Sequence, residues 1–196
     1  MLRRVFIPCF VVIAIGCSSA AVQAQWVVHA LGGTVQSVRA AKKTMNLNTD
    51  DGSSGEFQFP ETANINVSFD KDVRAETEPA DKLSGDAHQV ILFFFGVDLV
   101  RTAFAVEDLG TGPFVKVTGT VVSFNKHDHT LTLQTNAGPP QTFVVGDKTV
   151  VDTAGGVASG HGFKAEKGDH LRLLAESKDG KQQAMLIRTS GIDAAI

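Results

Sequence analysis

Three neighbouring residues, His127, Asp128 and His129, are the clearest candidates for metal chemistry in this sequence. Imidazole nitrogens and carboxylate oxygens are common ligands of divalent transition metals. On an extended strand the two histidines would point to the same side, because side chains alternate with a period of two. His161 lies in the same half of the chain and would add a third imidazole if the fold brings it close. The competing interpretation is a hydrated turn, and the surrounding sequence decides between the two.

The segment around these histidines is one of two copies of the same unit. A shift of 86 residues places 33–49, GTVQSVRAAKKTMNLNT, on 119–135, GTVVSFNKHDHTLTLQT, with seven of the 17 positions identical. Internal repeats of this kind indicate that one structural unit is used twice. The two histidines align with Ala41 and Lys43, so the turn does not require histidine. We therefore favour the hydrated turn and keep the metal site as the alternative.

The pattern within each copy predicts a small barrel. Apolar and polar residues alternate in 130–135, TLTLQT, which is typical of a half-buried strand, and the later segments 103–106 and 184–187 also align. Five short strands joined by glycine- and proline-rich turns favour a closed barrel, because closure hides the strand edges. We expect an all-β chain with two tandem five-stranded OB-like barrels, at residues 30–110 and 113–191.

The repeated motifs carry a resemblance to a known family. They are Gly-Thr-Val-x-Ser at 33–37 and 119–123, Thr-Leu-Thr-Leu at 130–133, and Gly-Asp-x-Leu-x-Leu at 168–173. Together they resemble a family of exported bacterial OB-like barrel domains of unknown function. The resemblance covers both copies. It implies an OB-like fold and a location in the cell envelope, and it implies no activity.

Residues 1–24 have the composition of an export signal. Two arginines follow Met1-Leu2, and the apolar run 5–15 is too short to span a bilayer. Two processing sites are consistent with this segment. Residues 14–17 resemble a bacterial lipobox and would leave a lipidated Cys17, whereas residues 22–24 resemble a signal-peptidase site with cleavage after residue 24. We favour the lipobox because Cys17 directly follows the apolar run.

Export places the protein in the periplasm, or at the outer membrane as an anchored lipoprotein. In the second case a lipid on Cys17 would be its contact with the membrane. The two cysteines, Cys9 and Cys17, both lie in or beside the signal, so the expected folded part has no disulfide and no cysteine nucleophile.

The charge argues against nucleic acid as a partner. The chain has 18 basic and 21 acidic residues, a net charge of −3, and without Arg3 and Arg4 it has 16 against 21, or −5. An acidic domain has no electrostatic reason to bind a phosphate backbone. The predicted outward positions of the strands also lack the aromatic rings on which bases stack.

Catalytic motifs are missing from the sequence. It contains no G-x-S-x-G, and the glycine-rich segment 155–160, GGVASG, lacks the lysine of a phosphate-binding loop. Ser159 and His161 are close in sequence, but sequence proximity does not place a hydroxyl against an imidazole. We therefore predict that the protein is not an enzyme and carries no cofactor.

The last hairpin of each copy shows the clearest difference between them. In copy two the tip carries Asp179 and Gly180, whereas in copy one the segment 90–106, VILFFFGVDLVRTAFAV, is apolar almost to its turn. Alternation gives its first strand two apolar faces, and each face needs a cover. The barrel core covers one face. Val90, Leu92 and Phe94 line one face and Ile91, Phe93 and Phe95 line the other, and the second barrel or a partner must cover whichever face the barrel core does not.

These observations predict a non-catalytic binding or scaffold protein of the cell envelope. Its partner would be another envelope protein or a second copy of the chain. We expect the contact to involve Phe93, Phe94, Phe95, Val97 and Leu99.

The alternative function is periplasmic binding of a divalent transition metal through His127, His129 and His161. Some periplasmic copper and silver chaperones are single OB-like barrels, and this chain resembles them in compartment. Their site combines a tryptophan, two methionines and a histidine. Here Met45 and Met185 align with apolar residues of the other copy, so that site does not transfer.

Overall fold

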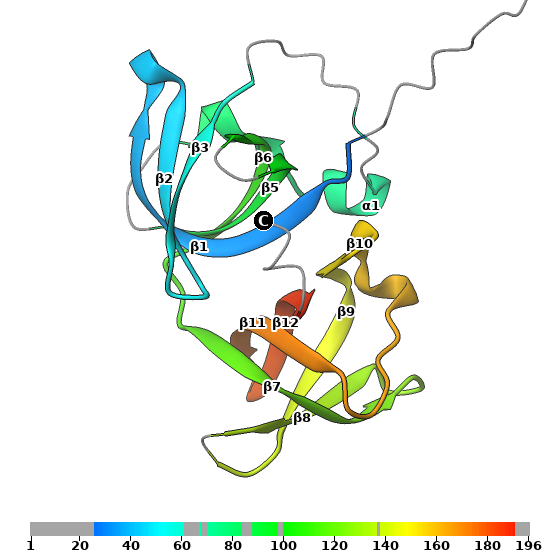
Figure 1. The fold of residues 1–196 in the computed structure, drawn as a ribbon. Helices are drawn as coiled ribbons and strands as arrows, with labels where there is room; N and C mark the ends of the chain where they lie inside the picture. The colour runs from blue at the N-terminus through cyan, green and yellow to red at the C-terminus, as the bar shows by residue number, and fades with distance from the viewer. Residues whose placement is uncertain are drawn as a thin grey trace, which may run out of the picture.

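A computed structural model describes residues 26–60, 67, 70–83, 88–97, 100–136 and 138–190, with backbone alone at 97 and 100 (Figure 1). The expected signal, Cys17 and Leu99 lie outside the described residues. The described chain forms two β units stacked one above the other (Figure 1). No helix among the described residues is long and apolar enough to cross a membrane.

The first unit is a closed barrel of five strands. These are β1 (His29–Arg39), β2 (Thr44–Thr49), β3 (Ser54–Gln58), β5 (Gln89–Val97) and β6 (Val100–Gly110). Between the third and fourth barrel strands lie the helix α1 (Lys71–Arg74), the two-residue strand β4 (Glu78–Pro79) and the 3₁₀ turn η2 (Ala80–Lys82). A further 3₁₀ turn, η1 (Ala40–Lys42), joins β1 to β2.

The second unit repeats this design. Its barrel strands are β7 (Phe114–Asn125), β8 (Thr130–Thr135), β9 (Gln141–Thr153), β11 (His170–Lys178) and β12 (Lys181–Thr189). The connection between the third and fourth strands contains β10 (Gly156–Ser159) and the 3₁₀ turn η3 (Gly160–Gly162).

Pairing among the five barrel strands is the same in the two units, although the additional strand β4 pairs with β6 and the additional strand β10 pairs with β9. In each, the first strand pairs with the second and fourth, and the third and fifth strands run parallel and close the barrel. This is the strand order of a five-stranded OB barrel. The predicted all-β fold of two tandem OB-like barrels is confirmed.

The repeat extends to the register of the first hairpin. Gly33 pairs with Thr49 as Gly119 pairs with Thr135, and both hairpins have an irregularity two residues later. A Cβ on Gly33 would lie 2.5 Å from the carbonyl oxygen of Asn48, and one on Gly119 would lie 2.6 Å from that of Gln134. Both copies therefore need glycine where a neighbouring backbone approaches closely.

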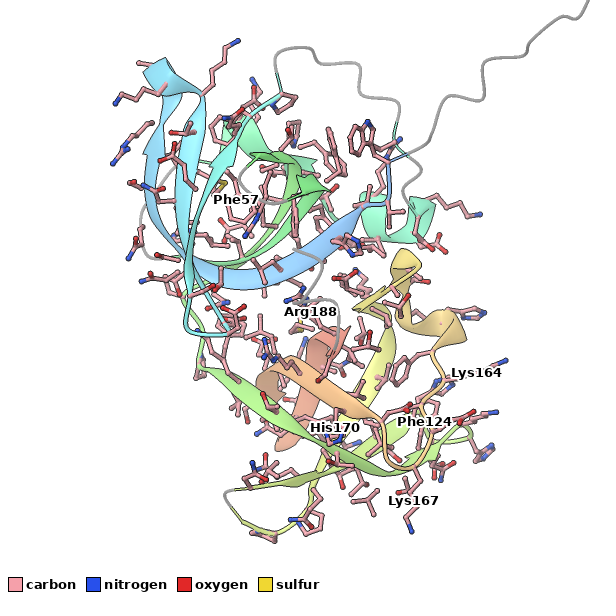
Figure 2. The ribbon with its side chains drawn as sticks, in the orientation of Figure 1. Phe57, Phe124, Lys164, Lys167, His170 and Arg188 are labelled. Carbon is pink, nitrogen blue, oxygen red and sulfur yellow. The ribbon has the colours of Figure 1, made fainter. Side chains whose placement is uncertain are left out.

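Each barrel has its own apolar core. The first contains Met45, Leu47, Phe57, Leu92 and Phe94, all fully buried, and Figure 2 shows Phe57 within this barrel. The second is built from equivalent strand positions and includes Leu131, Leu133, Phe143, Leu173 and Ile187. Burial of such apolar side chains is the main force that stabilises small barrels.

A third apolar cluster joins the barrels. From the first barrel it includes Val28, Ala30, Ile91, Phe93 and Ala105, and from the second it includes Val150, Leu174 and Leu186. The backbone N–H of Val157 on β10 also donates to the carbonyl of Val28 at 3.0 Å. The two barrels thus share a buried interface.

Candidate functional site

The apolar hairpin of the first barrel is formed by β5 and β6. Val90, Leu92 and Phe94 point into the barrel core, where the Phe94 ring meets the edge of Phe57 at a centroid distance of 5.4 Å. The alternation that the sequence predicted for β5 is therefore present. Its inner face completes the core of its own barrel.

The outer face of β5 is covered by the second barrel. Ile91 and Phe93 have no exposed surface and belong to the cluster that contains Val150, Leu174 and Leu186. The sequence left open whether the second barrel or a partner covers this face. The structure shows that the second barrel covers it at Ile91 and Phe93. The second barrel buries Phe93 and the core of the first barrel buries Phe94, so our expectation that these two residues form an accessible contact surface is corrected.

Phe95 differs from its neighbours because it is only partly buried. Its ring lies 5.7 Å from that of Trp26 and 6.0 Å from that of Phe104, centroid to centroid. We call Trp26, Phe95 and Phe104 the aromatic platform. Trp26 is the most exposed large apolar residue among those described, at 54%, and the adjacent Val27 is 46% exposed. The side chain of Val97 and the whole of Leu99 lie outside the described residues.

The sequence contained one signal for this platform. Trp26 is the one tryptophan of a chain that has no tyrosine, and it precedes the repeat. A tryptophan outside the repeat is not part of the strand pattern that the two barrels share. The repeat, which spans residues 30–110 and 113–191, gives no indication of it.

The His-Asp-His segment forms a turn rather than part of a strand. Asn125 accepts a hydrogen bond from the backbone N–H of His127 at 2.9 Å, and its amide donates to the Asp128 carboxylate at 2.6 Å. His129 has a left-handed backbone with φ of 51°, and Lys43 has φ of 52° at the equivalent position. The turn that we favoured from the sequence is therefore present, whereas the strand on which both histidines would share one face, as the metal alternative requires, is not.

His161 is not joined to these two histidines in a metal cluster. It lies in η3, where its Nδ1 is 3.4 Å from Oδ1 of Asp147, and both side chains are largely exposed. Within the described ranges, no three His, Cys, Asp or Glu side chains come close enough together to hold a metal ion. The proposed set of three histidines is not assembled.

A buried polar network crosses the interface between the barrels. Asp152 on β9 has no exposed surface and accepts from Arg188 Nε at 3.3 Å, while its other oxygen is 3.0 Å from His29 Nδ1. His29 belongs to the first barrel, and Figure 2 shows Arg188 between the barrels. A buried carboxylate requires such partners, because removing it from water is costly.

Beside this network lies a cavity of about 180 Å³ between the barrels, which we call the inter-barrel cleft. The first barrel contributes Asp50 and Asp51 from the loop between β2 and β3. The second contributes Lys116, Arg172 and Arg188. Aliphatic side chains complete the lining: Leu31, Val117, Leu173, Leu174 and Leu186.

Two ion pairs bridge the inter-barrel cleft. Lys116 Nζ lies 2.7 Å from Asp50, and Arg172 lies 3.8 Å from Asp51. Burial alone would raise the pKa of Asp51, but hydrogen bonds from Thr49 and Ser53, with the charge of Arg172, outweigh it and lower the pKa to about 2. Asp51 is therefore ionised at any physiological pH.

A third ion pair joins the barrels at a separate place. Lys148 on β9 lies 3.0 Å from Glu76, which follows α1. Nearby on β6, burial raises the pKa of Glu107 to about 7; the negative charge of Glu76 adds to the shift and Lys148 opposes it. This end of the interface contains an acid that titrates near neutral pH.

Comparison with protein-family models and with curated proteins finds no match to this chain. The fold therefore rests on the strand pairing described above, and the function must be argued from the surface and the cleft.

Proposed function

We propose that this protein is a non-catalytic binding protein of the cell envelope, and that the aromatic platform is its contact surface. The observation that carries the proposal is the exposed residue Trp26, whose ring lies tilted against that of Phe95 at the edge of the interface between the barrels. Tryptophan is enriched at the energetic centres of protein contacts, because it buries a large apolar area at a small entropic cost.

The position of the platform favours a rigid binding site. Phe95 continues the strand whose preceding residues, Phe93 and Phe94, are buried in the interface and in the barrel core. Trp26 is held from the other side, where it forms a parallel bridge with Val67. A partner would meet aromatic rings that are already positioned, so little conformational entropy is lost on binding.

The size of the platform favours a short apolar segment of another envelope protein over a second copy of this chain. An exposed tryptophan offers at most about 250 Å², whereas a stable dimer buries about 800 Å² on each partner. Export by the N-terminal signal, with or without a lipid on Cys17, would bring the platform to the compartment where such partners occur.

Site-specific photocrosslinking in the native cell tests this proposal. A photoreactive phenylalanine analogue replaces Val27, beside the platform, and in a control replaces Val122, an equally apolar exposed residue of the second barrel. We expect one predominant envelope protein to crosslink from position 27 and not from position 122. A crosslinked dimer of this chain would instead support self-association.

Purified protein then provides the decisive measurement. Because Trp26 is the single tryptophan, its emission reports on the platform alone. The crosslinked partner should shift this emission to shorter wavelength at a saturating concentration, and Phe95→Ser should weaken binding at least tenfold. Equal crosslinking from both positions, or no spectral shift, would contradict the proposal.

A further inference from the structure

The inter-barrel cleft has the composition of a binding site for a small molecule, and it is separate from the aromatic platform. It is a partly open cavity formed between the two barrels, and ligand sites often form at such domain interfaces. Its volume of about 180 Å³ corresponds to roughly six water molecules in the liquid. It therefore suits a compact molecule rather than a peptide.

The charges in the cleft are divided between its two walls. Both lining carboxylates, Asp50 and Asp51, belong to the first barrel, and all three lining cations belong to the second. One cation, Arg188, already faces the buried Asp152. With that carboxylate included, three positive and three negative groups balance each other.

This balance limits the class of ligand. A ligand with a net charge would leave one protein charge without a counterpart in a partly buried site, which is unfavourable. A zwitterion keeps the balance, because its cationic end can meet the aspartates while its anionic end meets Lys116 and Arg172. The aliphatic lining between the two walls suits an apolar body.

The repeat shows that these charged residues are not needed for the barrel itself. Strand pairing makes Lys116 equivalent to Ala30 and Arg172 equivalent to Ile91. The position of Asp50 is occupied by Asn136 in the second copy. The same framework therefore folds without them.

The backbone of the first barrel is shaped to hold one of these carboxylates. A Cβ on Gly32 would lie 2.1 Å from Oδ2 of Asp50, so the carboxylate occupies the space that any larger side chain would fill. The N–H of Asp50 donates to the Gly32 carbonyl at 2.9 Å, and the Gln89 amide lies 3.2 Å from both carboxylate oxygens. These contacts fix the acidic wall before any ligand arrives.

From this geometry we propose that the inter-barrel cleft binds a small zwitterion with an aliphatic body, of the class of the apolar α-amino acids. Binding exchanges the cross-barrel ion pairs for pairs with the ligand. The ammonium group is held by Asp50 and Asp51. The carboxylate is held by Lys116 and Arg172, for which the planar guanidinium of Arg172 offers two parallel donors.

Calorimetric titration of the full chain with three matched probes tests this assignment. Leucine carries both charges, leucinamide keeps the ammonium alone, and 4-methylpentanoate keeps the carboxylate alone. We expect leucine to bind and each analogue to bind at least tenfold more weakly. No binding of leucine at millimolar concentration, or equal binding of either analogue, would overturn the proposal.

Variants then assign the binding to the cleft. Lys116→Met should weaken leucine binding by tenfold or more. Its side chain is 45% exposed, so the fold should survive the change. Arg172→Met is a second, independent variant. Lys148→Met removes a cross-barrel ion pair outside the cleft and should leave leucine affinity unchanged. An equal loss in Lys148→Met, or no loss in either cleft variant, would refute a site in the cleft.

Discussion

The two barrels are built on one framework and differ in what faces the partner barrel. Both have the same order of barrel strands, the same irregularity in the first hairpin and a left-handed residue at the equivalent position before the second strand. At the shared interface, however, the pair Ile91–Glu107 of the first barrel corresponds to Arg172–Arg188 of the second. Residues common to both copies make the barrel, whereas residues that differ dock the barrels and line the cleft.

The largest effect should come from the apolar contact between the barrels. Phe93→Ala removes a fully buried ring from the interface, and we expect a loss of about 3–5 kcal/mol in the free energy of unfolding. Leu174→Ala, at the equivalent position of the second barrel, should cost about 2–4 kcal/mol. Urea denaturation measures both. A cost below about 1 kcal/mol for either would show that the interface contributes little.

The second largest loss of stability should come from disrupting the buried polar network around Asp152. Asp152→Ala leaves Arg188 buried without its carboxylate, and a loss of about 3 kcal/mol is expected. Asp147→Ala is the matched control, because Asp147 also faces a histidine but is 79% exposed. The control should change stability by less than about 0.5 kcal/mol. Equal effects of the two substitutions would contradict the assigned role of Asp152.

The acid on β6 predicts a dependence on pH. The pKa of Glu107 is about 7 in the folded protein, above its ordinary value of 4.5, so the folded state binds this proton more tightly than the unfolded state. The contribution of Glu107 to the free energy of unfolding is fully present below about pH 4.5 and is lost as the pH rises through 7. Glu107→Gln should therefore add about 1–2 kcal/mol at pH 8 and much less at pH 5. Equal effects at both pH values would exclude this explanation.

The smallest change in stability is expected at the turn that follows the first strand of each barrel, and it should be equal in the two copies. Lys43 and His129 have left-handed backbones at equivalent turn positions, a conformation that favours glycine. Lys43→Gly and His129→Gly should each raise thermal stability by an amount worth about 0.5 kcal/mol. A stabilisation at one turn alone would show that the turns are not equivalent. A large loss at His129 would indicate a function for that imidazole.

Much of the fold could be predicted from the sequence, because the repeat and the period of two are local patterns. The alignment of Gly33 with Gly119 indicated that one unit is used twice, and the alternation in 90–95 indicated the two faces of β5, whereas the register of the hairpins came from the structure. The short elements between the third and fourth strands were not predicted. The helix α1 spans four residues, too few for a helical period to be visible.

The site was harder to predict because it depends on how the barrels dock. His29 and Asp152 are 123 residues apart, and no sequence pattern links them. The lining of the cleft similarly joins the loop after β2 to strands β7, β11 and β12. The histidine turn attracted attention by composition alone, although Asn125 and the turn geometry account for its structure.

The outer face of β5 packs against the second barrel, and we expect this contact to join the two barrels into one cooperative unit. Trp26 reports on the first barrel by fluorescence, and His127, His129, His161 and His170 report on the second by proton NMR. During urea unfolding the two signals should change together, with one midpoint and one m-value. Phe93→Ala should separate them. Separate midpoints in the unmodified protein would contradict the claim.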